Sequence, residues 1–188
     1  MKKTIIFLLA IFLFSGISFA QEKPIRIGLK FGVPNLAGLN LEYVTPLLDS
    51  KLAPTLDLSS ISVSSGDAEV SFSYLELGGN YYFVNEGKGL YGHFSYGRVG
   101  FKATYSDPLL GEGEGKLGIN LLNFKLGAKL GNGFYFRPEI GFGALTGASV
   151  VSVKYTDPST NTIVTQEEEI PGFLVGGVVF NIGFGVAF

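Results

Sequence analysis

Charged residues recur at alternate positions of segments that are otherwise apolar or glycine-rich. Arg26 and Lys30, for example, alternate with two isoleucines and a leucine. Alternate side chains of an extended strand share one face, so the charges gather on the face that also carries the glycines. Enclosed together, such side chains can form a hydrogen-bonded ion network, or a path that favours anions where basic groups are in excess. The residues assigned to this face are Arg26, Lys30, Glu42, Asp57, Glu76, Arg98, Lys102, Lys125, Lys129, Arg137 and Glu139.

The chain has one histidine, His93, and Ser95 follows it on the same strand face. A histidine that takes the proton of a serine is a common way to make a nucleophile, so this pair is the candidate site for an enzyme. However, residues i and i+2 of a strand lie ~7 Å apart, which is long for a nucleophile and its base. The chain has no cysteine and no cluster with metal-ligand spacing. We therefore expect no catalytic residue, no metal and no cofactor.

Two acidic segments have other interpretations. Residues 111–115 alternate glycine with Glu112 and Glu114, but they lack the lysine and the serine or threonine that end a phosphate-binding loop. We expect them to form a flexible tip of a loop that spans residues 106–116. The run of three glutamates at residues 167–169 is either a solvated face or a bridge, through divalent cations, to lipopolysaccharide head groups.

The elements that must hold these residues are strands, because a period of two runs through most of the chain. In residues 174–188 the even positions carry mostly large apolar side chains, whereas the odd positions carry mostly small ones. Where the alternation slips, near residues 97–98 and 121–122, we expect β-bulges. Turn residues divide the chain into about eight candidate strands, at residues 25–33, 38–46, 51–64, 68–84, 89–106, 116–131, 134–156 and 162–188.

The composition favours a membrane environment for these strands. Apolar residues make up 46% and charged residues only 16% of the 188 residues, with a mean hydropathy of +0.34. The face of glycine, serine, asparagine and scattered charges is too small and too sparsely charged for the surface of a soluble barrel, but it suits a narrow interior. Because only a closed barrel satisfies the backbone hydrogen bonds of strands in lipid, the sequence predicts an all-β protein, a closed antiparallel up-and-down transmembrane β-barrel.

The first 20 residues have the features of a secretory signal peptide. Two lysines precede an apolar run that ends in small residues at the cleavage site, so we expect a signal peptide at residues 1–20 and a barrel domain at residues 21–188. When Lys2 and Lys3 are removed from the 14 basic residues, 12 remain against 16 acidic ones. This negative balance gives no reason to expect a nucleic-acid partner.

Aromatic residues cluster beside two of the predicted turns, at residues 85–89 and 131–133. Tyrosine and phenylalanine gather in this way where the strands of a membrane barrel meet the lipid head groups. We therefore predict one aromatic girdle at this end of the barrel. Its residues are Tyr81, Tyr82, Phe83, Tyr91, Phe134 and Phe136.

The apparent signal peptide, the two-faced strands, the tight turns and the last strand resemble the small outer-membrane β-barrels of Gram-negative bacteria. The resemblance is to the OmpA-transmembrane-domain, OmpX and OmpW type and to the outer membrane protein beta-barrel families of Bacteroidetes. It implies a location in the bacterial outer membrane, among its lipid and lipopolysaccharide. It also implies that the last strand is the signal read by the barrel assembly machinery, with Phe180, Ile182, Phe184, Val186 and the terminal Phe188 as its residues.

Members of such families are structural, adhesive, transporting or enzymatic, so the fold does not determine the function. An eight-stranded barrel is about wide enough for its own side chains to fill. We therefore expect a monomeric, non-enzymatic surface protein with a plugged or very narrow charged lumen. The alternatives are a narrow anion-preferring pore, an OmpW-like channel for small hydrophobic ligands, and a lipid-modifying enzyme that uses His93.

Overall fold

The computed structural model describes residues 23–84, 87–107, 111–146, 150–157, 162–169 and 177–188, and the predicted signal peptide lies outside them. Among these residues no helix is long and apolar enough to cross a membrane. The ten strands of this part of the chain are β1 (Ile25–Val33), β2 (Leu36–Tyr43), β3 (Leu52–Ser65), β4 (Ala68–Tyr82), β5 (Gly89–Asp107), β6 (Gly111–Lys129), β7 (Phe134–Leu145), β8 (Val150–Asp157), β9 (Thr162–Glu169) and β10 (Gly177–Ala187).

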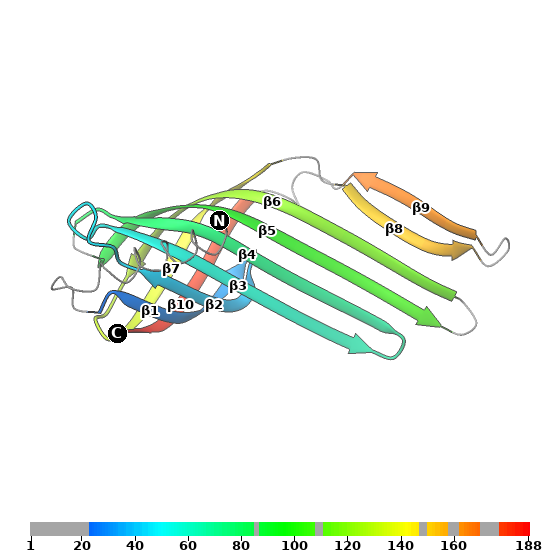
Figure 1. Ribbon diagram of the computed structural model, residues 1–188, viewed down its shortest axis with the longest axis horizontal. Helices are drawn as coiled ribbons and strands as arrows, with labels where there is room; N and C mark the ends of the chain where they lie inside the picture. The colour runs from blue at the N-terminus through cyan, green and yellow to red at the C-terminus, as the bar shows by residue number, and fades with distance from the viewer. Residues whose placement is uncertain (1–22, 85–86, 108–110, 147–149, 158–161, 170–176) are drawn as a thin grey trace, which may run out of the picture.

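Eight of these strands close into a barrel (Figure 1). The order around the barrel is β5-β4-β3-β2-β1-β10-β7-β6, and pairing of β5 with β6 completes the circle. Each of these pairs is antiparallel. The predicted fold, a closed antiparallel up-and-down barrel of about eight strands, is therefore confirmed. Closure leaves no edge strand within the barrel, as strands in lipid require.

Two predicted strands, at residues 134–156 and 162–188, are wrong in their extent, because each of them divides. β7 follows β6 only as far as the pair Leu121 and Leu145. Farther along, β6 pairs instead with β8, and β8 forms a hairpin with β9 that lies outside the barrel. The hairpin supplies hydrogen-bond partners to the part of β6 that β7 leaves unpaired. The acidic run at residues 167–169 is the end of β9.

The loop and the bulges predicted in β5 and β6 are also wrong. These two strands pair without a break in register from Gly89 and Lys129 to Asp107 and Gly111. Residues 111–115 therefore belong to a strand, and the alternation passes through residues 97–98 and 121–122 without a bulge. Two partners of equal length satisfy each other's backbone groups even where glycine alternates with glutamate.

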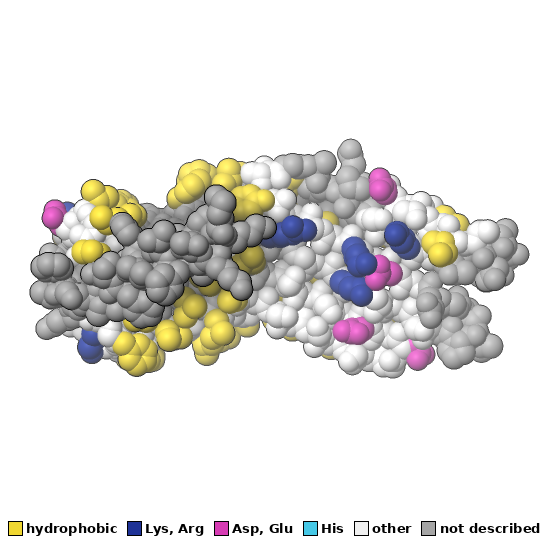
Figure 2. Space-filling model, viewed as in Figure 1, with side chains coloured by type: hydrophobic (Ala, Val, Ile, Leu, Met, Phe, Trp, Pro, Cys, Tyr) yellow, Lys and Arg dark blue, Asp and Glu magenta, His cyan; other side chains and the backbone are white. Residues whose placement is uncertain are grey.

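Large apolar side chains cover the outer surface of the barrel. Leu29 and Phe94 are exposed by 50% and 53%, whereas Lys30, beside Leu29 in the chain, is exposed by 1%. Figure 2 shows this cover as the yellow atoms over one half of the molecule. Such a surface suits lipid and would be unstable in water. This apolar belt comprises Ile25, Ile27, Leu29, Phe31, Leu39, Leu41, Leu58, Leu75, Leu77, Phe94, Tyr96, Phe124, Leu126, Ile140, Phe142, Phe180, Phe184 and Val186.

Strands β3 to β6 continue beyond the other barrel strands, and there the two faces exchange their character (Figure 1). We call residues 60–73, 98–107 and 111–120, with the β8–β9 hairpin, the extension. Its face continuous with the lumen is apolar, and Ile119 is buried there against Val99 and Leu117. Its outer face is polar, with Ser60, Ser62, Ser71, Ser73, Arg98, Lys102, Lys116 and Asn120. The extension therefore has the pattern of a sheet in water, whereas the barrel has the pattern of a sheet in lipid.

The lumen depends on glycine where large side chains cross it. A Cβ at Gly185 would meet the ring and hydroxyl of Tyr135 and, at 2.5 Å, the carbonyl oxygen of Ile27. We expect Gly185→Val to lower the free energy of unfolding by ~1–3 kcal/mol, because overpacking forces its neighbours to move. Urea unfolding of the folded barrel in lipid vesicles, followed by circular dichroism, would measure this.

Gly115→Val is the matched control, because no atom lies within 4 Å of a Cβ at that position. It should leave the unfolding midpoint near that of the wild type. Equal midpoints for the two variants would show that the lumen tolerates the extra volume.

Candidate functional site

The lumen holds a charge-balanced set of side chains. Among the described residues, four acidic and four basic side chains are buried there and in contact with one another. A buried charge is costly unless it is paired and hydrogen-bonded, so equal numbers allow the set to be neutral without a change of protonation. We call these eight residues the lumen network, which comprises Arg26, Lys30, Glu42, Asp57, Glu76, Lys125, Arg137 and Glu139.

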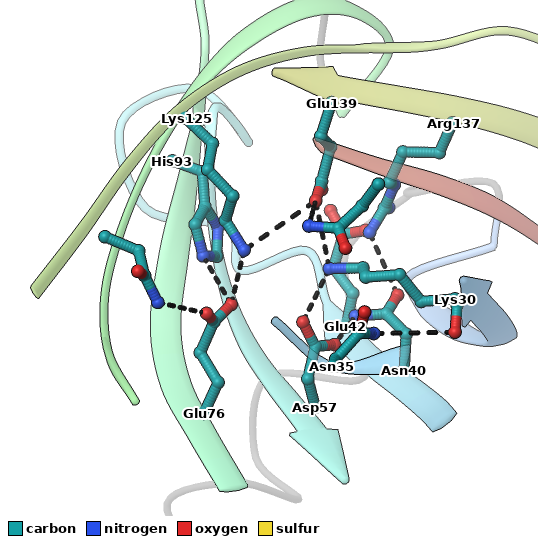
Figure 3. Close-up of polar contacts among 12 residues, drawn as sticks. Lys30, Asn35, Asn40, Glu42, Asp57, Glu76, His93, Lys125, Arg137 and Glu139 are labelled. Atoms are coloured by element: carbon teal, nitrogen blue, oxygen red, sulfur yellow. Dashed lines mark hydrogen bonds and ion pairs between the residues drawn. The ribbon is translucent and has the colours of Figure 1, made fainter. Parts of the chain in front are cut away.

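Glu76 is the centre of one half of the network (Figure 3). Its carboxylate accepts hydrogen bonds from Lys125 Nζ at 2.5 Å and from Asn123 Nδ2 at 2.6 Å. The Tyr74 hydroxyl also donates to it, and His93 Nε2 lies 3.1 Å from Oε1. These side chains come from β4, β5 and β6, so one carboxylate joins three neighbouring strands across the interior.

Lys30 is the centre of the other half. Its Nζ lies 2.5 Å from Asp57 Oδ2 and 3.2 Å from Glu139 Oε2. Glu139 also accepts a hydrogen bond from the Tyr91 hydroxyl at 2.6 Å. Lys125 Nζ lies 3.7 Å from Glu139 and so connects this half to Glu76 (Figure 3). The network therefore crosses the lumen from one wall to the other.

Two arginines add a third group around Glu42. Arg26 Nη1 lies 3.0 Å from Glu42 Oε1, and the Tyr82 hydroxyl donates to the same oxygen at 2.6 Å. Arg137 pairs with Glu42 as well, and its Nη1 donates to Asn40 Oδ1 at 3.0 Å. Asn40 in turn donates to the Asp57 carboxylate, which links this group to Lys30. All eight charged side chains thus belong to one connected set.

The prediction that Arg98 and Lys102 face the lumen is wrong. Arg98 stands opposite Leu75 of the apolar belt and shares its outward face, and the side chain of Lys102 is 48% exposed. We predicted that the basic residues face inward along the whole of β5, but in the extension they face outward. Lys129 does face inward, where its ammonium donates to the carbonyl oxygen of Gly131 at 3.2 Å.

The predicted aromatic girdle is wrong at two positions, because Tyr82 and Tyr91 are fully buried in the lumen. Their rings lie 5.2 Å apart and their hydroxyls bond to the network. The error follows from the alternation, since Tyr81 and Tyr82 are adjacent and cannot both point outward. Of the other girdle residues, Tyr81, Phe83 and Phe134 are exposed on the outside, and the half-buried Phe136 contacts Phe184 there.

The predicted charge network omitted the uncharged polar residues of the lumen, although asparagine was expected on the same strand face. Asn40, Asn80, Asn123 and Asn181 are each buried by at least 98%, and they hydrogen-bond to charged groups or to His93. Asparagine is depleted in strands, so an asparagine on the charged face of an alternating segment is itself a sign of an enclosed polar site. That signal was present in the sequence.

The structure places His93 in the lumen, where Asn80 and Glu76 hold its ring. Nδ1 lies 2.6 Å from Asn80 Oδ1, and Nε2 lies 3.1 Å from Glu76 Oε1. Ser95 is buried nearby, but its hydroxyl has no hydrogen-bond partner among the described residues. Both ring nitrogens are engaged elsewhere, so neither is placed to take a proton from Ser95. Among all the residues that the structure describes, no three His, Cys, Asp or Glu side chains are grouped to hold a metal ion.

Four of the five residues of the predicted assembly signal lie on β10, and Phe188 follows the strand. Phe180, Phe184 and Val186 are exposed on the apolar belt, and Phe188 is exposed at the end of the chain. β10 pairs with β1, so this strand forms one side of the seam that closes the barrel. The recognition role of these residues stays a prediction.

The network should be most sensitive at Glu76. We expect Glu76→Leu to lower the free energy of unfolding by ~3–5 kcal/mol, because it leaves the buried Lys125 without its closest carboxylate. The double change Glu76→Leu and Lys125→Met should recover most of that loss, since it removes both charges. Urea unfolding in vesicles would measure both variants.

Glu114→Gln is the control, because it removes a carboxylate whose partners are exposed. A Glu76→Leu variant as stable as this control would contradict the importance of the network.

No protein-family model and no curated protein matches the chain. Among solved structures, it is similar to a major outer membrane protein from Thermus thermophilus, with a TM-score of 0.52 and 14% identity over 87% of this chain and 97% of that one. It is also similar to CarO from Acinetobacter baumannii, with a TM-score of 0.45 and 13% identity over 90% of this chain and 100% of that one. The Thermus match and the closed barrel show that the chain has the fold of outer-membrane β-barrel proteins.

Proposed function

We propose that the protein is a monomeric, non-enzymatic surface protein of the bacterial outer membrane whose lumen is closed to solutes. The observation that carries the proposal is the lumen network, in which eight paired charges connect opposite walls of the barrel. A solute could pass only by separating buried ion pairs, which costs several kcal/mol for each charge left alone. Tyr82 and Tyr91 fill further space beside the arginines.

The proposed orientation follows from the two ends of the barrel. The connections from β2 to β3 and from β4 to β5 lie at one end, and the extension projects from the other. Outer-membrane barrels have short periplasmic turns and longer extracellular parts. The extension, with its polar outer face, therefore stands outside the cell and provides the surface for contact with other molecules. Outer-membrane lipid and lipopolysaccharide surround the belt, and β10 is the strand read by the barrel assembly machinery.

The anion-preferring pore has lost its main support. Two of the three basic residues predicted in excess, Arg98 and Lys102, face outward. Five basic and four acidic side chains remain in the lumen, and the one in excess, Lys129, lies outside the balanced lumen network. One observation still supports the alternative of a channel for hydrophobic ligands, namely the apolar inner face of the extension. Phe72 and Phe101 lie opposite each other on this face, beyond the lumen residues Tyr74 and Gly97 of the same strands. Ligand held there would still meet the closed network beneath it.

Conductance distinguishes a closed lumen from a pore. Wild-type protein in planar lipid bilayers should give no ion-selective current steps. The variant Lys30→Ala, Asp57→Ala, Lys125→Ala and Glu139→Ala removes two charges of each sign and should conduct, because it opens the centre of the lumen without leaving a net charge. Circular dichroism of both samples verifies that they are folded. Clear selective steps from the wild type would contradict the proposal.

An activity assay tests the non-enzymatic part. Wild-type protein mixed with lipid A and phospholipid should release no fatty acid and transfer no acyl chain, because His93 and Ser95 lack the contact that activates a nucleophile. Mass spectrometry of the lipids would measure both reactions. Turnover that His93→Ala abolishes, while the fold is retained, would establish the enzymatic alternative instead.

A further inference from the structure

The outer face of the extension carries a groove of about 390 Å³ that residues of β3, β4, β5 and β6 line. Its basic residues are Arg98, Lys102 and Lys116, and small residues such as Gly100 and Gly118 lie between them. Figure 2 shows dark blue basic side chains over the half of the molecule that lacks the yellow belt. We call this feature the basic groove. The basic groove lies outside the lumen, and the proposed closure of the lumen does not involve it.

The strand register explains the shape of the groove. Lys102 and Lys116 are directly opposite each other, and Arg98 lies four residues along β5, so it is ~13 Å away along the strand. Gly100 and Gly118, also directly opposite each other, occupy the row between. The guanidinium of Arg98 leans over this row, with Nη2 3.9 Å from where a Cβ of Gly118 would stand. The glycines therefore form a floor that three long basic side chains surround.

The charges of the groove are only partly neutralised. Glu114 lies 3.2 Å from Lys102 Nζ and also pairs with Lys116, and the hydrogen bonds from Lys116 and Lys102 hold the pKa of Glu114 below its usual range. One carboxylate thus serves two ammonium groups that face each other, an unfavourable arrangement without a further anion. Among the described residues, no carboxylate forms an ion pair with Arg98.

The height of the groove relative to the apolar belt points to its ligand. On the outer face Arg98 stands beside Leu75, and Tyr96 is the next outward residue toward the belt. Leu75 and Tyr96 are exposed by 44% and 49% and belong to the belt. The basic groove therefore begins where the apolar surface ends, at the level of lipid head groups if the belt lies in the hydrocarbon region.

We propose that the basic groove binds a phosphate group on the head group of a glycolipid of the outer leaflet, of the lipid A type. An arginine guanidinium can bind two oxygens of one phosphate in a bidentate manner, and a lysine ammonium binds phosphate as a point charge. Ser60, Ser71 and Ser73 line the same groove and can hydrogen-bond to sugar hydroxyls. The acyl chains of the same molecule would contact the belt below. This inference rests on the proposed position in the outer membrane with the extension outside.

The location also distinguishes a lipid from a free anion. A soluble phosphate gains only the contacts of the groove, whereas a lipid gains those of the groove and of the belt at once, as two linked binding events. We therefore expect the folded full chain in nonionic micelles to bind diphosphorylated lipid A at least tenfold more tightly than dephosphorylated lipid A. Inorganic phosphate at the same concentration should not displace it. Isothermal titration calorimetry measures all three.

Variants separate the groove from general attraction to the micelle. Each basic residue near an anionic lipid surface contributes about fivefold in affinity, so Arg98→Gln, Lys102→Gln and Lys116→Gln together should weaken binding by roughly 100-fold. Lys51→Gln, which removes one charge at the opposite end of the barrel, should bind as the wild type does. Gly118→Leu keeps every charge but fills the floor, and it should also weaken binding.

Several outcomes would overturn the proposal. These are equal affinity for the two forms of lipid A, displacement by equimolar inorganic phosphate, wild-type affinity in the triple variant, and an equal loss in Lys51→Gln. The micelle assay does not depend on location or on a closed lumen. Failure of the proposed function would appear separately, as wild-type protein that fractionates with the inner membrane or conducts in bilayers.

Discussion

Backbone hydrogen bonding in a medium without water is the constraint on which this structure depends. Each peptide group that faces hydrocarbon must find its partner within the protein, and strands achieve this only by closing into a ring. Eight strands close the ring here, through the pairs of β1 with β10 and of β5 with β6. Closure then restricts the interior, since alternate side chains must point into a space that is about wide enough for side chains alone to fill.

The lumen shows how such a space accommodates charge. If every inward side chain were apolar, the strands would be apolar on both faces, and the chain would aggregate easily before it inserts into the membrane. Polar inward residues avoid that hazard, but once enclosed they must satisfy one another. The buried asparagines and tyrosines do so by filling hydrogen-bonding positions that the eight charges leave open. The lumen network thus meets two requirements: the unfolded chain needs polar residues to avoid aggregation, and the folded barrel needs those residues to be paired.

The sequence predicted the barrel, its topology and nine of the eleven inward charges. In lipid the large apolar face of each alternating strand must point outward, so the alternation also shows which charges point inward. The prediction failed where this rule no longer holds. At Arg98 the alternation continues but the solvent changes, so a rule that places large apolar residues outward assigns the wrong face. Tyr82 and Tyr91 failed for a different reason, since an aromatic residue with a hydroxyl suits both an interface and a polar interior. The partners within the network could not be predicted, because they depend on strands that are distant in the sequence.

The exchange of faces along β5 also restricts how the strands can slide. A barrel with one uniform pattern tolerates a shift of two residues, because such a slip restores every side chain to its own face. Here the same slip would carry Arg98 into the hydrocarbon or draw Tyr96 out of it, since the two lie on either side of the change. The boundary between the two patterns therefore acts as a vertical marker that sets the depth of the protein in its membrane, a property that closure alone does not provide.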